Sequence, residues 1–373
     1  MTSTRHRSEP VFIPRPGELE DSPVEREDLR RRVSEALDGF LDRQDARLAS
    51  MAGEVGEMVL ALRDLLSAGK RLRPAFGYWA WRGTGMPDDD RMVVAAAALE
   101  LFQASAIIHD DVMDSSDTRR GRPTVHRRFG ALHRAEGWRS DEEAFGAGAA
   151  ILVGDLCLGW SDEMFFGCRL APERLVRARP IFDEMRTELM GGQYLDLLEQ
   201  ALGGGSVARS RRVIQYKSAR YSVLRPLQLG AALAGAGRQL RAAYDAYGLP
   251  LGEAFQLRDD VLGVFGDPAE TGKPAGDDLR EGKRTVLVAL AVQHGSRAQV
   301  RVVDRYLGDP ALDIVGMESL RQVLVETGAL AEVERMIAAS TERALNALAA
   351  VEVAPPADRA LRELAAAATA RRS

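Results

Sequence analysis

Cysteine, lysine and long hydrophobic runs are all scarce in this sequence of 373 residues. Cys157 and Cys168 are the two cysteines, and they form no CxxC pair. Their spacing excludes a disulfide framework and a cysteine-based zinc site, and it favours the reducing cytoplasm. Residues 1–16 lack the apolar run of a signal peptide. The formal charge of −5, with both signs interspersed, argues against a nucleic-acid-binding protein.

The sequence also lacks a convincing membrane span. The best candidate, residues 93–108, is interrupted by Glu100 and Gln103 and is shorter than the ~20 apolar residues that a span needs. It instead predicts a buried helix that leads directly to Asp110. We therefore expect no transmembrane segment.

Helical periodicity is the main pattern in the remaining chain. Residues 1–22 are rich in proline and charge and predict a disordered tail, whereas 23–373 predict one helical domain. Strand-like alternation is scarce and no βαβ rhythm occurs, so the fold class is all-α, a single large helical bundle. We expect long helices over 207–236 and 239–265, a break at Gly248–Pro250 and a polar surface loop over 131–143.

A first aspartate-rich segment follows the apolar 93–108 stretch. Asp110 and Asp114 are four residues apart, so a helix places both carboxylates on one face, where like charges destabilise it without a cation. Hard oxygen ligands of this kind suit Mg²⁺, which binds through a few carboxylates together with substrate phosphates. Arg119 and Arg120 follow, placed to meet phosphate oxygens.

A second apolar helix ends in Asp259 and Asp260 and is followed by a glycine-rich loop with Lys273 and Lys283. Either aspartate segment alone is also compatible with a solvated, capped helix end. Two such segments on separate apolar helices, each followed by basic residues, favour magnesium ions that hold a diphosphate.

A third segment, residues 69–74, places Lys70 and Arg73 beside a helix that opens at Pro74. Backbone N–H groups at a helix start and neighbouring cations bind anions. The chain has only four lysines, and three of them, Lys70, Lys273 and Lys283, lie in glycine-containing segments. Lysine is a compact point charge, which suits a phosphate oxygen cluster, although chance survival of four lysines is the alternative.

Five motifs follow one another along the chain: GKRLRP at 69–74, DDVMDSSDTRRG at 110–121, GGQYLDL at 191–197, YKSARYS at 216–222 and FQLRDDVLGVFGDP at 255–268. With these motifs the sequence resembles the trans-type polyprenyl diphosphate synthases, from about residue 65 to 285. The resemblance implies an all-α bundle around a deep central cavity, Mg²⁺ as cofactor and a homodimer. It also implies two substrates, isopentenyl diphosphate and an allylic diphosphate.

The resemblance assigns roles to individual residues. Metal binding falls to Asp110, Asp114 and Asp259, and these three, with Lys217 and Gln256, form the implied catalytic set. The allylic diphosphate would be held by Arg119, Lys217, Lys273 and Lys283. Isopentenyl diphosphate would be held by Lys70, Arg73, Gln103 and Arg120. Supporting polar groups are Asp196, Ser218 and Gln256. The sequence departs from the family at Gly263, where many relatives carry a further aspartate, so one ligand position is weaker or supplied by water.

The implied reaction is the magnesium-dependent head-to-tail condensation of the two substrates to a linear all-trans prenyl diphosphate. Ser105 and Ala106 are small, and Phe102 is the first bulky residue on that stripe, so we expect Phe102 to be the floor and geranylgeranyl diphosphate the main product. Phe102 as an ordinary core residue is the alternative, with a farnesyl or longer product. A class I terpene cyclase and a non-catalytic partner subunit are also considered, but the second aspartate pair and the Lys70–Arg73 site favour chain elongation.

Overall fold

The computed structural model describes residues 22–203, 205–267 and 276–369. Its helices are α1 (Leu29–Ala49), α2 (Gly56–Leu66), α3 (Leu72–Arg82), α4 (Asp90–Met113), α5 (Val125–Ala135), α6 (Glu142–Phe166), α7 (Pro172–Leu202), α8 (Val207–Val213), α9 (Arg225–Ala234), α10 (Arg238–Phe265), α12 (Asp277–Arg280), α13 (Val286–His294), α14 (Arg297–Tyr306), α15 (Ile314–Glu326), α16 (Ala329–Ala349) and α17 (Pro355–Thr369). Short 3₁₀ turns are η2 (Arg26–Asp28) and η3 (Gly53–Val55), and η4 (Ile214–Leu224) is a π-helical segment.

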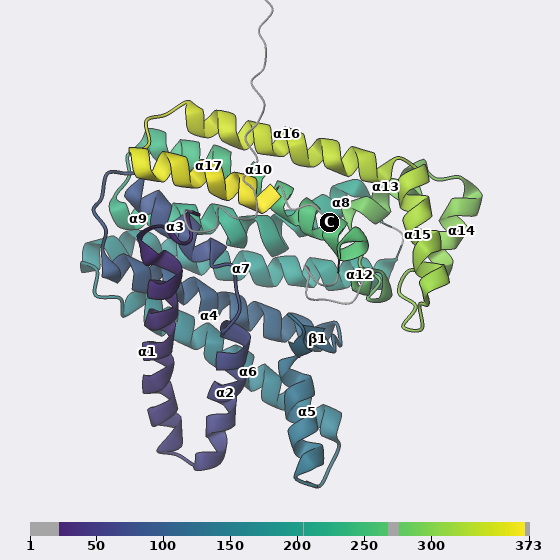
Figure 1. The fold of residues 1–373 in the computed structure, drawn as a ribbon, viewed down its shortest axis with the longest axis horizontal. Helices are drawn as coiled ribbons and strands as arrows, with labels where there is room; N and C mark the ends of the chain where they lie inside the picture. Colours follow the sequence, from purple (N-terminus) through teal and green to yellow (C-terminus); the bar gives the residue numbers. More distant parts are fainter. Residues whose placement is uncertain (1–21, 204, 268–275, 370–373) are drawn as a thin grey trace, which may run out of the picture.

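The all-α expectation is confirmed. Long helices stack in layers, with α16 and α17 on one side of the bundle and α13, α14 and α15 at one end (Figure 1). On the opposite side α1, α2 and α5 project away from the bundle (Figure 1). The strands β1 (Thr118–Arg119) and β2 (Arg122–Pro123) form a short antiparallel hairpin directly after α4.

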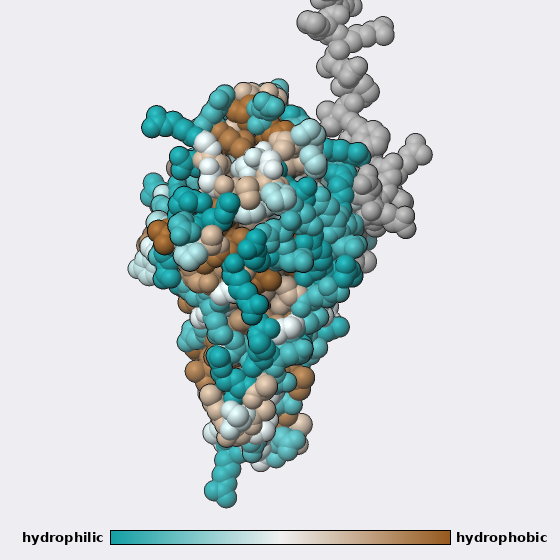
Figure 2. Space-filling model, turned by 90° about the vertical axis from the view of Figure 1, so that its left-hand side faces the viewer, coloured by the Kyte–Doolittle hydropathy of each residue, from teal (hydrophilic) through white to brown (hydrophobic). Residues whose placement is uncertain are grey.

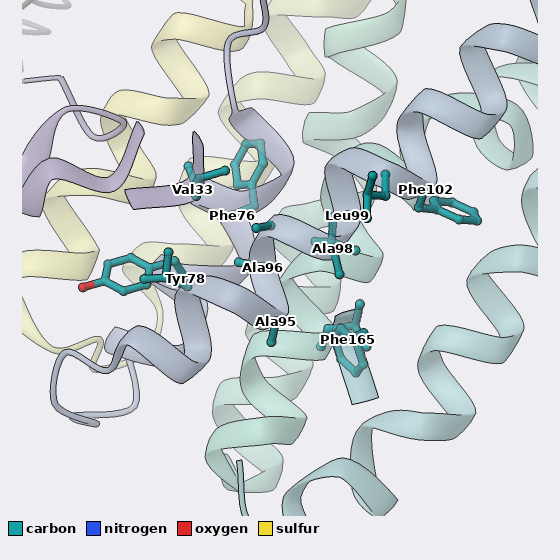
Figure 3. Packing of buried hydrophobic residues seen from close by; sticks show 14 of the residues in the cluster. Val33, Phe76, Tyr78, Ala95, Ala96, Ala98, Leu99, Phe102 and Phe165 are labelled. Atoms are coloured by element: carbon teal, nitrogen blue, oxygen red, sulfur yellow. The ribbon is translucent and has the colours of Figure 1, made fainter. Parts of the chain in front are cut away.

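Helix α4 lies at the centre of the packing, in contact with α1, α3 and α6. The alanines from Ala95 to Ala104 are almost completely buried, and because their side chains are small, neighbouring helices approach closely. Figure 3 shows Ala95, Ala96 and Ala98 on this helix among larger side chains such as Phe76 and Phe165. The interior is thus dense along the part of α4 that carries these alanines.

Local sequence signals explain where several helices begin. The side chains of Asp89, Asp141 and Asp313 each accept a hydrogen bond from a backbone N–H in the first turn of α4, α6 and α15. Ser296 and Gln299 form a reciprocal capping box at α14. Such caps satisfy N–H groups that have no partner inside the helix, and each stabilises by about 1 kcal/mol.

Two expectations about breaks and loops are wrong. Helix α10 runs through Pro250, because close packing on η4 and α16 outweighs the lost backbone hydrogen bond. Residues 131–135 belong to α5, so only part of the expected loop over 131–143 is a loop. The expected helix over 207–236 is confirmed as one continuous helical run from Val207 to Ala234, in which α8 and α9 are joined by the π-helical η4. The predicted tail at 1–22 lies outside the described residues, apart from Ser22.

The surface is mixed in character. Figure 2 shows a face that is mainly hydrophilic, with separate hydrophobic areas. Within the described residues, α4 and α6 are long and apolar enough to cross a membrane by length and composition. The apolar window of α4 is 72% buried inside the fold, whereas that of α6 is only 39% buried. Helix α4 is therefore a core helix, and α6 leaves an apolar face uncovered.

Candidate active site

A cavity of about 1170 Å³ lies between α4, α7, η4 and α10 and is closed at its edges by the turn before α3 and by residues 277–285. Many of the residues singled out from the sequence line it: Lys70, Arg73, Gln103, Ala106, Asp110, Arg119, Arg120, Asp196, Lys217, Ser218, Gln256, Asp259 and Lys283. Asp114, Phe102 and Ser105 do not line it. Lys273 lies outside the described residues.

Helix α7 and segment η4 approach each other backbone to backbone at Gly192. A Cβ at this position would clash with the backbone of Tyr216 and Lys217, so the motif needs a glycine here. The close approach brings Gln193 and Asp196 of α7 next to Lys217. The π-helical winding of η4 is of the kind found at functional sites, and it turns Lys217 and Ser218 into the cavity.

Lys217 is the centre of a charged cluster at the end of α4. Its Nζ donates to Asp110 Oδ1 at 2.8 Å and to Asp196 Oδ2 at 2.7 Å. Gln193 Nε2 donates to the same Asp110 oxygen at 2.9 Å. Burial alone would raise the pKa of Asp110, but Lys217 and Lys283 hold that pKa well below its usual range. Asp110 therefore carries its charge at any physiological pH.

Asp114 has a different environment, although it lies one turn further along the same helix. Its side chain is only 1% exposed, and both carboxylate oxygens lack a hydrogen-bond donor within the described part of the chain. The nearest cation is Lys283, whose Nζ lies 3.5 Å from Asp114 Oδ2. Burial and the neighbouring Asp110 charge raise the pKa of Asp114 to about 6. Buried carboxylate oxygens without donors are the environment expected of a metal ligand.

Among the described residues, no three acidic or histidine side chains converge to form a complete metal cage. This agrees with the coordination that Mg²⁺ prefers, in which a few carboxylates hold the ion and phosphates and water complete its shell. Asp110 and Asp259 face one cavity from opposite helices. The residues present thus fit an ion that arrives together with a diphosphate.

The two carboxylates of the second aspartate segment, at the end of α10, lie in different environments. Asp259 is exposed and lines the cavity. Asp260 is 7% exposed and accepts a hydrogen bond from Gln256 Nε2 at 2.8 Å. Burial, together with the nearby charges of Asp278 and Asp259, raises the pKa of Asp260 to about 8. Asp260 is therefore largely neutral at pH 7, whereas Asp259 is the member of the pair with an exposed side chain in the cavity.

Asp278 occupies the space that the missing side chain of Gly263 leaves. A Cβ at Gly263 would clash with Asp278 Oδ2, so the carboxylate fills the position from the opposite wall of the cavity. Lys283 Nζ lies 3.2 Å from Asp278 Oδ1 and 2.5 Å from Glu281 Oε2. These carboxylates raise the pKa of Lys283 although burial opposes the shift. The departure at Gly263 is thus matched by a carboxylate fifteen residues later in the chain.

The basic residues form a second group at the other edge of the cavity. Arg73 Nη2 donates to Tyr221 Oη at 2.7 Å and to Ser222 Oγ at 2.8 Å. Its Nε is buried without a partner in the part of the chain that the structure describes. Lys70 and Arg120 line the same region, as does Gln103. Arg119 lies between the two groups, paired with the buried Asp111 and 4.0 Å from Asp110 Oδ2.

The predicted product floor lies behind the cavity wall. Ala106 lines the cavity, whereas Phe102 is 1% exposed and packs against Phe182 and Tyr221, with ring centroids 6.3 and 6.1 Å away. Tyr221 itself lines the cavity, so its ring stands between the cavity and Phe102. Ser105 is buried.

Several residues were missed by the reasoning from sequence. Gln193 and Tyr221 lie inside two of the motifs, and this position could have identified them as candidate site residues. Asp278 and Glu281 follow the glycine-rich loop. Their acidic side chains near Lys283 in the sequence were a weaker indication of a role in the site. No local signal links Asp278 to Gly263, because the contact forms only when residues 277–283 fold back onto α10.

Comparisons with known proteins agree with this geometry. A family model described as polyprenyl synthetase matches residues 57–322. The chain is 32% identical over 308 residues to a geranylfarnesyl diphosphate synthase of Aeropyrum pernix, covering 82% of this chain and 89% of that protein. It is 34% identical over 253 residues to a geranylgeranyl diphosphate synthase of Mycobacterium tuberculosis, with 68% and 67% covered.

Solved structures are similar over most of the chain. A geranylgeranyl pyrophosphate synthase from Corynebacterium glutamicum, complexed with isoprenyl diphosphate and magnesium, has a TM-score of 0.89 and 42% identity, covering 92% of this chain and 99% of that one. A polyprenyl synthase from Caulobacter crescentus CB15, complexed with calcium and isoprenyl diphosphate, has a TM-score of 0.73 and 28% identity, with 92% and 97% covered.

The all-α bundle and its aspartate-lined cavity define a prenyltransferase. The chain belongs to the polyprenyl synthetase family, whose members include prenyl diphosphate synthases of several product lengths, and the resemblance inferred from the motifs is confirmed.

Proposed function

We propose that the chain condenses isopentenyl diphosphate head-to-tail with an allylic diphosphate, in a magnesium-dependent reaction, to give a linear all-trans prenyl diphosphate. One observation carries the proposal. A single cavity has aspartates from two helices and buried lysines on one side, and a separate group of cations on the other. Two anion sites of different character suit two diphosphates, one bound with metal and one bound by basic residues alone.

The carboxylates of Asp110, Asp114 and Asp259 would hold the magnesium ions. Bound magnesium neutralises charge on the departing diphosphate and so stabilises its release. Lys217, Lys283 and Arg119 supply fixed positive charge beside the same group, in a site that excludes water. Lys217 is buried among carboxylates that raise its pKa, so its ammonium stays charged throughout the reaction.

The reaction breaks the allylic carbon–oxygen bond, and the pyrophosphate leaves with the electron pair. The double bond of isopentenyl diphosphate then forms the new carbon–carbon bond, and loss of one proton restores a double bond. Lys70, Arg73, Gln103 and Arg120 would hold the diphosphate of isopentenyl diphosphate during this step. No side chain is assigned as base, and by family resemblance the released pyrophosphate takes the proton. Exclusion of water protects the cation from hydrolysis.

Geranylgeranyl diphosphate is the proposed main product. The tail of the allylic substrate would extend past Ala106, and the next bulky side chain one turn deeper on α4 is Phe102. Tyr221 stands in front of Phe102, so the two rings together would limit the tail. Relatives with several different product lengths lie at similar identity, so the proposal rests on these side chains.

We also propose that the active form is a cytoplasmic homodimer. Helix α6 exposes Phe145, Ile151 and Leu152, and α7 exposes Tyr194 and Leu202. A second copy that covers these side chains accounts for the low burial of α6 without a membrane. Light scattering after size-exclusion chromatography measures the assembly, and Leu152→Glu should shift it toward the monomer. A monomeric native protein would exclude the dimer.

Radiolabelled isopentenyl diphosphate tests the proposed function directly. The full chain is incubated with dimethylallyl, geranyl and farnesyl diphosphates in turn, with magnesium or with a chelator. We expect an acid-labile C20 product that disappears when the chelator is present. A C15 product, or one longer than C20, would overturn the geranylgeranyl assignment but leave the synthase assignment intact. A cyclic hydrocarbon would identify a terpene cyclase, and no product with any primer would reject the synthase and favour a non-catalytic subunit.

A further inference from the structure

A buried ion pair lies directly behind the group of cations that lines one edge of the cavity. Arg71 is 5% exposed and Glu100 is 3% exposed. Arg71 Nη1 donates to Glu100 Oε2 at 2.5 Å, and Arg71 Nη2 donates to the carbonyl oxygen of Leu66 at 2.6 Å. Burial of two charges is costly unless both have well-aligned partners, as they do here. Neither residue has a role in the site described above.

Arg71 decides the direction of the turn before α3. Its backbone has a φ of 52°, in the left-handed region, which is unfavourable for a residue other than glycine. Arg71 stands next to Lys70 and two residues before Arg73, so its conformation sets where both cations point. The anchored guanidinium holds the turn in this unfavourable conformation.

A second guanidinium is held in the same place. Arg120 also has a positive φ, and its Nη1 donates to the carbonyl oxygens of Leu65 and Ala68 at the end of α2. A Cβ placed on Gly69 would lie 3.2 Å from Arg71 Nη1 and 3.5 Å from both Arg120 Nη1 and Glu100 Oε2. Two guanidinium groups and one carboxylate therefore converge on one small space.

The group of Arg71, Arg73, Arg120 and Glu100 carries more positive than negative charge. Burial and the neighbouring charges of Arg71 and Arg73 lower the pKa of Arg120, and Glu100 opposes this shift. Glu100 does not line the cavity, although Arg71 and Arg120 do. On α4, Glu100 shares one helical face with Gln103, which does line the cavity. The carboxylate thus lies behind the cations and leaves their cavity side open to an anion.

We propose that the Glu100–Arg71 pair is a positioning element for the metal-free diphosphate site. Glu100 holds Arg71, and Arg71 holds the turn that presents Lys70 and Arg73. The pair therefore controls the affinity for isopentenyl diphosphate and leaves the allylic site unchanged. This inference rests on the proposed function, because it takes isopentenyl diphosphate as the occupant of that site.

Calorimetric binding to the full-length protein tests the pair without turnover. Isopentenyl diphosphate is titrated into Glu100→Gln, Arg71→Met and the double variant, with no allylic substrate present. A charge-assisted hydrogen bond contributes about 1.5–3 kcal/mol, so we expect Kd to rise about 10-fold or more in each single variant. Arg71→Met should be the weaker binder, because it leaves a buried carboxylate unpaired behind an anion site. The double variant should bind better than Arg71→Met alone.

A second titration measures selectivity. Farnesyl thiodiphosphate with Mg²⁺ occupies the allylic site without reaction, and its Kd should stay within about twofold of the wild-type value. Arg71→Lys retains a charge that can pair with Glu100 and should recover part of the affinity for isopentenyl diphosphate. Equal weakening of both ligands would overturn the inference.

Glu188→Gln is the matched control. Glu188 is half-buried and accepts hydrogen bonds from the buried Arg225 at 2.6 and 2.8 Å and from Arg220, and none of the three residues lines the cavity. Thermal unfolding should show a comparable loss of stability, with unchanged binding of isopentenyl diphosphate. If Glu100→Gln lowers stability but binds isopentenyl diphosphate as the wild type does, the pair is merely structural.

The binding data also separate this inference from the proposed function. If the wild type binds isopentenyl diphosphate and the variants lose it selectively, but no primer gives product, the synthase assignment fails and the positioning role stands. If the wild type does not bind isopentenyl diphosphate, both fail. If the wild type forms product and the variants bind normally, only the positioning role is overturned.

Discussion

Substitution of Asp114 by asparagine should make the metal-free protein more stable. Asp114 is a buried carboxylate with no donor to its oxygens in the described residues, so its charge is poorly solvated. Asparagine has nearly the same shape and no charge. The gain in folding stability and the loss of metal binding would therefore come from the same change.

The magnitude follows from the shift in pKa. Burial and the charge of Asp110 raise the pKa of Asp114 from 3.8 to about 6. Between these two values the folded state keeps a proton that the unfolded state has lost, so wild-type stability falls as pH rises through this window. One pKa unit corresponds to about 1.4 kcal/mol, which gives at most about 3 kcal/mol. Above pH 6 the difference between the two proteins should stay constant.

Urea unfolding in the presence of a chelator measures this difference at pH 4, 5, 6 and 7.5. Wild type and Asp114→Asn should have similar free energies of unfolding at pH 4 and diverge up to pH 6. Asp304→Asn, at an exposed position on α14, is the control and should show no such divergence. A variant that is no more stable than the wild type at pH 7.5, or a difference independent of pH, would refute the reasoning.

Three further predictions test the site. Lys217→Met removes the ammonium that contacts Asp110 and Asp196, so kcat/KM for the allylic substrate should fall about 10- to 100-fold; recovery in Lys217→Arg would show that a point charge is not required. Gly263→Ala displaces the Asp278 carboxylate and should raise the Mg²⁺ concentration needed for half-maximal activity. The control Gly39→Ala on α1, with only a flexible arginine nearby, should not change it. An unchanged Mg²⁺ requirement in Gly263→Ala would exclude a role for Asp278. Phe102→Ala should lengthen products and Ala106→Phe should shorten them, as chromatography of the dephosphorylated alcohols would show; unchanged lengths in both would place the floor elsewhere.

Much of the architecture could be predicted because it depends on local patterns. Helical periodicity and the scarcity of strand-like alternation identified the all-α class. Most of the residues singled out in the motifs line one cavity, since each aspartate segment ends an apolar helix. The predictions failed where packing overrides local preference. Pro250 predicts a break, yet α10 continues, because its contacts with η4 and α16 outweigh one lost hydrogen bond.

Local sequence patterns could not predict which side chains contact one another in the site. Lys217 and Asp110 are 107 residues apart, and their contact depends on the close approach of α7 and η4 at Gly192. Asp110 and Asp114 likewise have different partners: Lys217 and Gln193 donate to Asp110, whereas the nearest cation to Asp114 is Lys283 at 3.5 Å. Spacing along a helix predicts a shared face but says nothing about what covers that face.

The sequence by itself determined the helical class, the family and the kind of chemistry, because periodicity and motif spacing are properties of short segments. Only the tertiary structure decided how charge is balanced in the site. Asp278 fills the space beside Gly263, and Glu100 stands behind the cations of the basic turn. The physical reason is that the energy of a buried charge depends on its partners and its solvation, and both are set by residues far apart in the chain.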